Sequence, residues 1–152
     1  MFSRQEASAL KEKFWTSFGQ YLLPVPSASG TKVNWINYKT GVKHIRFVMD
    51  ADREHAFVQI EITHPDAELR NRFYQLFETL KTELEAETQA EWNWNQSVEK
   101  EGKIISTIHI SLEDVNILNV QHWPAIISFF KPLIIGLDRF WFNQRDIFEM
   151  LA

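Results

Sequence analysis

The chain has 152 residues, enough for one domain that buries about two-thirds of the surface exposed by its unfolded form. A hydrophobic share of 45% excludes intrinsic disorder, and the lack of cysteine excludes disulfides, thiolate catalysis and Cys-ligated metal sites. The net charge of −4 argues against general binding to nucleic acid. We expect a single α+β domain over residues 1–152, located in the cytoplasm. No membrane span is expected, because charges and a proline interrupt the apolar C-terminal region.

Charge is distributed unevenly along the chain. Residues 1–50 carry a net charge of +4, residues 51–100 carry −6 and residues 101–152 carry −2. A basic strip in the first segment could face a phosphate. The simpler explanation is that these residues lie on a solvated strand edge, where their charges prevent non-native strand pairing. The strip consists of Lys32, Lys39, Lys43 and Arg46.

The first predicted element is a helix that begins with a capping box, formed by Ser3 and Glu6. Apolar residues recur at helical spacing within it, and a loop rich in proline and serine follows. Three strands are then predicted at 33–38, 43–49 and 55–63, with turn residues between them. Two consecutive hairpins of this kind form an antiparallel meander.

A second, amphipathic helix is predicted from the start signal at 63–66 to Leu84. Strands at 91–96 and 103–111 follow, each alternating apolar and polar residues. The last helix begins near Trp123, and Pro132 should kink or divide it. The sequence therefore predicts an antiparallel sheet of about five strands with three helices, in the order α-β-β-β-α-β-β-α.

One face of the predicted sheet has a mixed character. If the face with Ala56, Ile60 and Ile108 packs on the helices, the opposite face carries charged, polar and apolar side chains together. Such a mixture is typical of interfaces and ligand platforms, although a solvent face with scattered apolar residues is the simpler alternative. The candidate binding residues on it are His44, Arg46, Phe57, Gln59, Glu61 and His109.

A nuclease site is a second hypothesis, because the element order is also that of the restriction-endonuclease-like core. Such a core needs carboxylates that share one Mg²⁺. Here we expect Glu61 opposite Lys43 or His44, about seven residue pairs or roughly 20 Å from Asp50. Carboxylates so far apart cannot share a metal ion, and Thr63 stands where that site needs a lysine.

A metal or acid–base site is a third hypothesis, because His44, Glu61, His64 and Asp66 could converge at one end of a hairpin. No histidine pair has the spacing of metal ligands, and no nucleophile elbow or glycine-rich phosphate loop occurs. We therefore predict no catalytic residue, no metal ligand and no cofactor. An enzyme centred on His44, Glu61 and His109 is kept as the alternative.

Three separated segments, 33–41, 61–65 and 123–132, are similar to marked segments of a bacterial domain-of-unknown-function family. Short stand-alone members of that family resemble this chain over nearly its whole length. Longer members carry a related domain behind a restriction-endonuclease-like one. The resemblance implies an accessory association with DNA-processing proteins for those longer members, and it implies no catalytic residues.

The predicted function is a non-enzymatic binding or assembly module that uses the mixed sheet face, the apolar last helix or both. The expected partner is a protein or a second copy of the chain, since complementary basic and acidic segments favour an antiparallel homodimer. The alternative is a degenerate nuclease-like or metal-dependent nucleic-acid-processing protein. The net charge does not support a nucleic-acid partner.

Overall fold

A computed structural model describes residues 2–152. It contains one antiparallel sheet with the strand order β1-β2-β4-β3. This arrangement confirms the predicted α+β class. The elements in chain order are α1 (Arg4–Leu22), β1 (Ile45–Ala51), β2 (His55–Ile62), α2 (Ala67–Thr79), α3 (Lys81–Thr88), β3 (Asn93–Lys100), β4 (Lys103–Glu113), a 3₁₀ turn (Val120–His122) and α4 (Trp123–Leu151).

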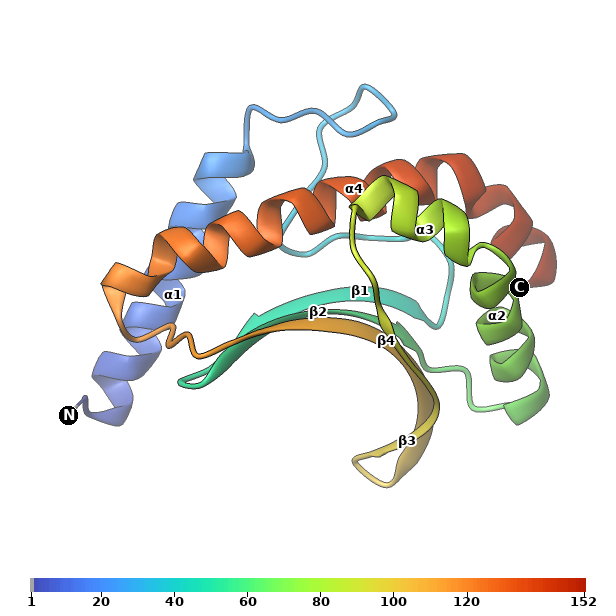
Figure 1. The fold of residues 1–152 in the computed structure, drawn as a ribbon, viewed down its shortest axis with the longest axis horizontal. Coiled ribbons are helices and arrows are strands. Elements are labelled where there is room, and N and C mark those ends of the chain that lie inside the picture. The colour runs from blue at the N-terminus through green and yellow to red at the C-terminus, as the bar shows by residue number, and fades with distance from the viewer. Residues whose placement is uncertain (1) are drawn as a thin grey trace.

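The helices and the sheet form two layers. Helices α1 and α4 lie over one face of the sheet, while α2 stands at one end of it (Figure 1). The β3–β4 hairpin curves away from the helices, so the opposite face is concave. A register shift between Asn95 and Val98 marks an irregularity in this hairpin, and such bulges bend the strand that carries them.

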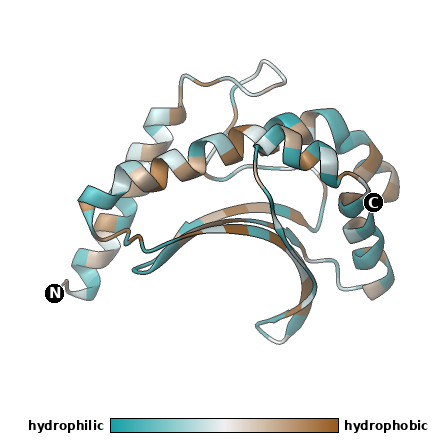
Figure 2. Cartoon of the chain, viewed as in Figure 1, coloured by the Kyte–Doolittle hydropathy of each residue, from teal (hydrophilic) through white to brown (hydrophobic). Residues whose placement is uncertain are grey.

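The hydrophobic core lies between the layers. Hydrophobic segments of the strands and of α4 face one another across this space (Figure 2). The predicted inner residues Ala56, Ile60 and Ile108 are all fully buried, which confirms the inward face of the sheet. Helix α1 adds Phe14 and Phe18 from one stripe of its surface. Among residues 2–152, no helix has the length and apolar character that a membrane crossing needs.

The predicted capping box is present at the start of α1. The backbone N–H of Glu6 donates to Ser3 Oγ over 3.1 Å, and the N–H of Ser3 donates to Glu6 Oε1 over 3.2 Å. The two bonds satisfy amide groups that the first turn of a helix leaves free.

Residues 33–38 do not form a strand, so this prediction was wrong. The sheet consequently has four strands rather than about five. The side chain of Asn34 accepts from the N–H groups of Ile36 and Asn37, which makes a turn where a ladder would need extended backbone. Trp35 Nε1 donates to the Val25 carbonyl over 3.0 Å, so this segment folds onto its own loop.

The single helix predicted to end at Leu84 is divided at Leu80, which gives four α-helices instead of three. Leu80 has φ −97° and ψ 16°, outside the helical region. The change in direction brings the end of α3 against α4, where Gly136 faces Glu87 and Thr88. The observed order is therefore α-β-β-α-α-β-β-α.

Helix α4 runs from Trp123 to Leu151 with Pro132 inside it. The expected division of the helix at Pro132 therefore does not occur. Pro132 is exposed. Further along, the buried Asp138 accepts hydrogen bonds from Tyr38 Oη over 2.6 Å and from Ser27 Oγ over 2.9 Å. The backbone N–H of Ala28 donates to the same carboxylate over 2.7 Å, so Asp138 ties the loop between α1 and β1 to the helix.

Candidate functional site

The sheet face turned away from the helices, termed the open face, brings together five of the six predicted binding residues, whereas the sixth, His44, lies just before β1. In the ladders Arg46 pairs with Glu61 and Gln59 pairs with His109, while Phe57 follows along β2 at the strand's side-chain period. The open face consists of Arg46, Val48 and Asp50 on β1, Phe57, Gln59 and Glu61 on β2, and Thr107 and His109 on β4.

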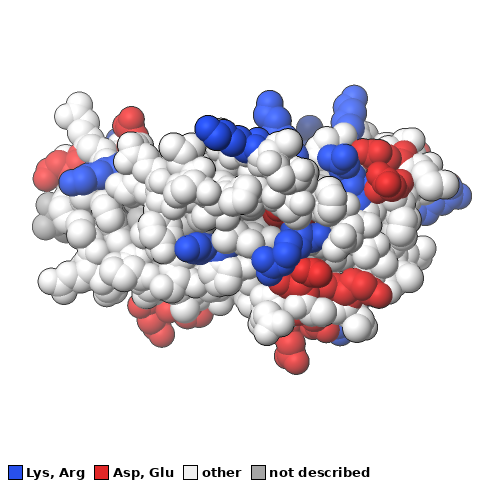
Figure 3. Space-filling model, turned by 90° about the horizontal axis from the view of Figure 1, so that it is seen from above, with Lys and Arg blue, Asp and Glu red and all other residues white. Residues whose placement is uncertain are grey.

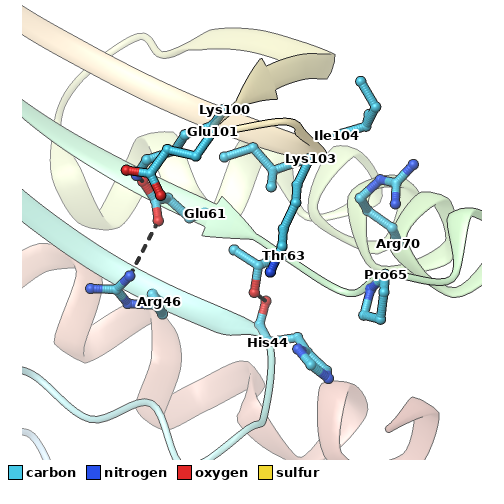
Figure 4. A pocket seen from close by; sticks show the side chains of 11 residues that line it. His44, Arg46, Glu61, Thr63, Pro65, Arg70, Lys100, Glu101, Lys103 and Ile104 are labelled. Carbon is cyan, nitrogen blue, oxygen red and sulfur yellow. Dashed lines mark hydrogen bonds and ion pairs between the residues drawn. The ribbon is translucent and has the colours of Figure 1, made fainter.

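Glu61 is at the centre of a charged network and only 1% exposed. Its carboxylate accepts from Gln59 Nε2 over 2.7 Å and from Lys100 Nζ over 2.9 Å, and Arg46 Nη1 lies 3.6 Å from it. Figure 4 shows the contact with Arg46 as a dashed line. Glu61 is therefore a buried carboxylate with two cations, and its partner across the strands is Arg46 rather than Lys43 or His44 as expected.

The strand register explains this difference. Ala51 pairs with Ala56, so the turn begins at Asp52 and not at Asp50. When the turn of a hairpin is shifted along the sequence, every residue of its two strands acquires a different partner. Glu61 consequently faces Arg46 rather than a residue before β1.

A pocket of about 690 Å³ lies beside Glu61, between the open face, the start of α2 and the β3–β4 hairpin. Figure 4 shows Lys103 directed toward Thr63 and His44 within it. Four cations and two carboxylates line this basic pocket. They are Arg46, Arg70, Lys100, Lys103, Glu61 and Glu101.

Arg70 reaches the basic pocket from α2 and is only 7% exposed. Its Nη1 donates to the His64 carbonyl over 2.9 Å, but its Nε has no hydrogen-bond acceptor. In the part of the chain that the structure describes, no carboxylate lies within ion-pair distance of this guanidinium. Sequence reasoning missed Arg70, although it precedes the buried Phe73 and Phe77 by three and seven residues and so lies on the apolar stripe of α2.

The hairpin turn places two more cations at the basic pocket. Glu101 and Gly102 have φ values of 52° and 78°, which define a two-residue turn with both central residues in the left-handed region. Lys100 and Lys103 pair directly across it. The strand predicted at 91–96 therefore continues to Lys100, and the Glu-Gly dipeptide was the signal for this tight turn.

Two histidines form the edge of the basic pocket. The rings of His44 and His64 lie 4.5 Å apart between centroids. Partial burial lowers the pKa of His44, and the nearby His64 and Lys43 lower it further. The carbonyl of His44 accepts from the N–H of Thr63 over 2.8 Å, and His44 has φ 71°, a conformation rare for residues with a side chain.

The other end of the open face carries the opposite charge. Asp50 pairs with Phe57 in the ladder, and His55 pairs with Glu113. The ring of His55 stacks on Phe57 with 5.9 Å between centroids, and His55 Nδ1 lies 3.1 Å from Asp52 Oδ1. The open face therefore runs from a cluster of cations near Arg70 to a cluster of carboxylates near Phe57.

The geometry gives little support to the metal and nuclease hypotheses. The register separates Asp50 from Glu61 by four residue pairs, roughly 13 Å, which is shorter than expected but too far for one shared cation. His64 Nδ1 accepts from the N–H of Asp66, and Asp66 caps α2. Within residues 2–152, no three His, Asp or Glu side chains group so that they could hold a metal ion.

The fold and the site define an α+β domain with a polar, concave sheet face and a basic pocket at one end of it. The family model described as Domain of unknown function (DUF4268) matches residues 10–145, and the chain belongs to this family. This match confirms the expected membership of a domain-of-unknown-function family. No curated protein and no solved structure matches the chain.

Proposed function

We propose that the domain is a non-enzymatic assembly module that binds a protein partner on its open face. The observation that carries this proposal is the division of charge along that face. The end near Arg70 and Lys103 is basic, and the end near Asp50 and Glu113 is acidic. A partner with charges of both signs matches such a surface, whereas a nucleic-acid strand along it would meet repulsion at the acidic end.

The side chains between the two ends support a binding role. Gln59 and Lys100 are held by hydrogen bonds to Glu61, so these polar groups are fixed before any partner arrives. Phe57 and Val48 are only half-buried and offer apolar area beside them. Fixed polar groups around apolar contacts lower the entropy lost on binding.

The helix-covered side offers less to a charged partner. Figure 3 shows that side, where much of the surface is uncharged and several cations lie directly beside carboxylates. The longer family members implied by the sequence resemblance carry a further domain, which fits an accessory role in assembly.

The partner we propose is a second copy of the chain. In a two-fold arrangement the basic end of one open face meets the acidic end of the other, which makes the surface complementary to itself. Because the open face is concave, the two copies would have to cross. The β3–β4 hairpin of each copy would then enter the arch of the other.

Replacing Phe57 with Asp tests this proposal. We expect the wild-type chain to sediment as a dimer and Phe57→Asp to sediment as a folded monomer, because the new carboxylate adds charge at the acidic end and removes apolar contact area. The control is Phe142→Asp, since Phe142 is an exposed apolar residue on α4. A wild-type chain that is monomeric at all concentrations, or equal loss in both variants, would contradict the proposal.

A further inference from the structure

We propose that the basic pocket binds the phosphate group of a phosphate ester. This inference goes beyond self-assembly, because it rests only on the geometry of the pocket within one copy of the chain. The pocket is formed by α2, the end of β2, the start of β1 and the β3–β4 hairpin (Figure 4).

The charges that line the basic pocket are unbalanced. Arg46 and Lys100 both contact Glu61, so one buried carboxylate faces two cations. Lys103 and Arg70 line the same space, and within residues 2–152 neither has an ion pair to a carboxylate. A doubly charged anion among these four side chains would compensate the excess positive charge. A phosphate monoester is such an anion near neutral pH.

Arg70 is buried without an opposite charge in the described part of the chain. Burying a guanidinium costs free energy unless hydrogen bonds and an opposite charge replace its water. Arg70 is buried, yet its only hydrogen-bond acceptor in the described chain is the His64 carbonyl, and its Nε is unpartnered. A phosphate bound in the pocket would supply the missing negative charge beside this guanidinium.

The size and lining of the pocket also suit a phosphate ester. Its volume of about 690 Å³ exceeds what inorganic phosphate fills, and it falls in the range of small-molecule sites. Pro65, Ile104 and Ile105 add apolar surface beside the cations. This combination suits an ester whose organic part lies on the apolar surface while its phosphate contacts the charged groups.

The experiment is a calorimetric titration of the full chain at constant ionic strength with inorganic phosphate, adenosine 5′-monophosphate, adenosine, sulfate and a single-stranded oligonucleotide with or without a 5′-phosphate. We expect adenosine 5′-monophosphate to bind more tightly than inorganic phosphate, and adenosine not to bind. Preference for the 5′-phosphorylated oligonucleotide over the mononucleotide would assign the phosphate to a nucleic-acid end, and the reverse order to a small molecule. Binding of none of the phosphate probes, or equal binding of phosphate and sulfate with no gain from the ester, would overturn the proposal.

Two variants and one control locate the binding. Lys103→Gln and Arg70→Met should each weaken phosphate-ester binding at least about tenfold, the loss expected from one charged hydrogen bond. Arg72→Gln is the control, because Arg72 lies on the same helix but pairs with Glu68 outside the pocket. Lys103 is exposed, so its variant tests the site even if Arg70→Met does not fold. Equal weakening in the control and in Lys103→Gln would contradict the proposal.

The titration also separates this proposal from the proposed assembly function. Phe57 lies on the open face but does not line the basic pocket. In the proposed dimer the acidic end of the other copy would lie at the basic pocket, so Phe57→Asp should bind the phosphate ester at least as tightly as the wild type does. Phosphate binding that is lost together with the dimer would place the site between two copies and contradict a pocket formed by one.

Discussion

Single buried polar residues hold the irregular parts of this chain in place. Asp138 is 2% exposed and accepts three hydrogen bonds from the loop between α1 and β1. Burial and the bond to Asp138 raise the pKa of the Tyr38 phenol, so Tyr38 remains a donor over the usual pH range. A segment without a helix or strand is thereby fixed by side-chain bonds to α4.

Tyr38→Phe removes one of these donors and should lower the free energy of unfolding by roughly 2 kcal/mol, the usual contribution of a hydrogen bond to a charged group. Chemical denaturation measures the change. The matched control is Tyr21→Phe, because Tyr21 Oη accepts from Lys131 at an exposed position and its loss should cost less than about 0.5 kcal/mol. Equal effects of the two variants would show that Asp138 does not anchor the loop.

Of the two histidines at the basic pocket, His64 disfavours the protonation of His44. The pKa of His44 should be below its usual value of about 6.5 and should rise in His64→Gln, because one of the groups that disfavour its charged form is removed. With this lowered pKa, His44 binds a proton more readily in the unfolded wild-type chain than in the folded one. His44 therefore lowers the free energy of unfolding as the pH falls below about 6.5. NMR titration of the histidine ring signals measures the pKa, and no rise in His64→Gln would contradict the proposed coupling.

Gly136 sets the distance between two elements, α3 and α4. A Cβ atom at this position would lie 2.5 Å from the Glu87 carbonyl oxygen and 2.8 Å from Thr88 Cα, both backbone atoms. Gly136→Ala should therefore lower the free energy of unfolding by roughly 1–3 kcal/mol, although alanine is the better helix former.

The control for this prediction is Gly19→Ala in α1. A Cβ atom there would lie 3.4 Å from Ile36 Cγ1, an ordinary contact. Helix propensity should then dominate and leave the stability unchanged or raise it by up to about 1 kcal/mol. Thermal unfolding of both variants distinguishes the cases, and a neutral Gly136→Ala would mean that α3 does not approach α4 so closely.

Some helices and strands could be predicted from local sequence signals, and others could not. The start of α1 followed from Ser3 and Glu6, because a capping box is a local arrangement that needs no tertiary contact. The strand predicted at 33–38 failed because Asn34 bonds to the backbone of its own turn, which competes with a ladder. The break at Leu80 was not visible, since Leu80 continues the apolar stripe and only the contact with α4 distinguishes it.

The candidate site could be predicted as a face but not as a pocket. Strand alternation was sufficient to place Phe57, Gln59 and Glu61 on the same side of the sheet. The curvature of the β3–β4 hairpin and the meeting of Arg70 with Lys103 join distant parts of the chain, and no local pattern encodes them. The register of the β1–β2 turn was likewise outside the reach of the sequence.

In the whole molecule, one concave face combines a cationic end, a central network around Glu61 with the half-buried Val48 and Phe57 beside it, and an anionic end. The helices bury one side of the sheet, and the charged network around Glu61 organises the other. This division of roles accounts for the mixed polar and apolar character of the open face. It also explains how a chain of net charge −4 presents a basic pocket.

The most direct test of this account is the solution mass of a charge-exchange series, measured by sedimentation equilibrium. Asp50 and Lys103 are exposed at opposite ends of the face, and a two-fold dimer would bring one near the other. We expect the wild-type chain to be a dimer, Asp50→Lys and Lys103→Glu each to be monomers, and the double variant to be a dimer again because the charges are once more opposite. Single variants that keep the wild-type mass, or a double variant that stays monomeric, would contradict assembly through the open face.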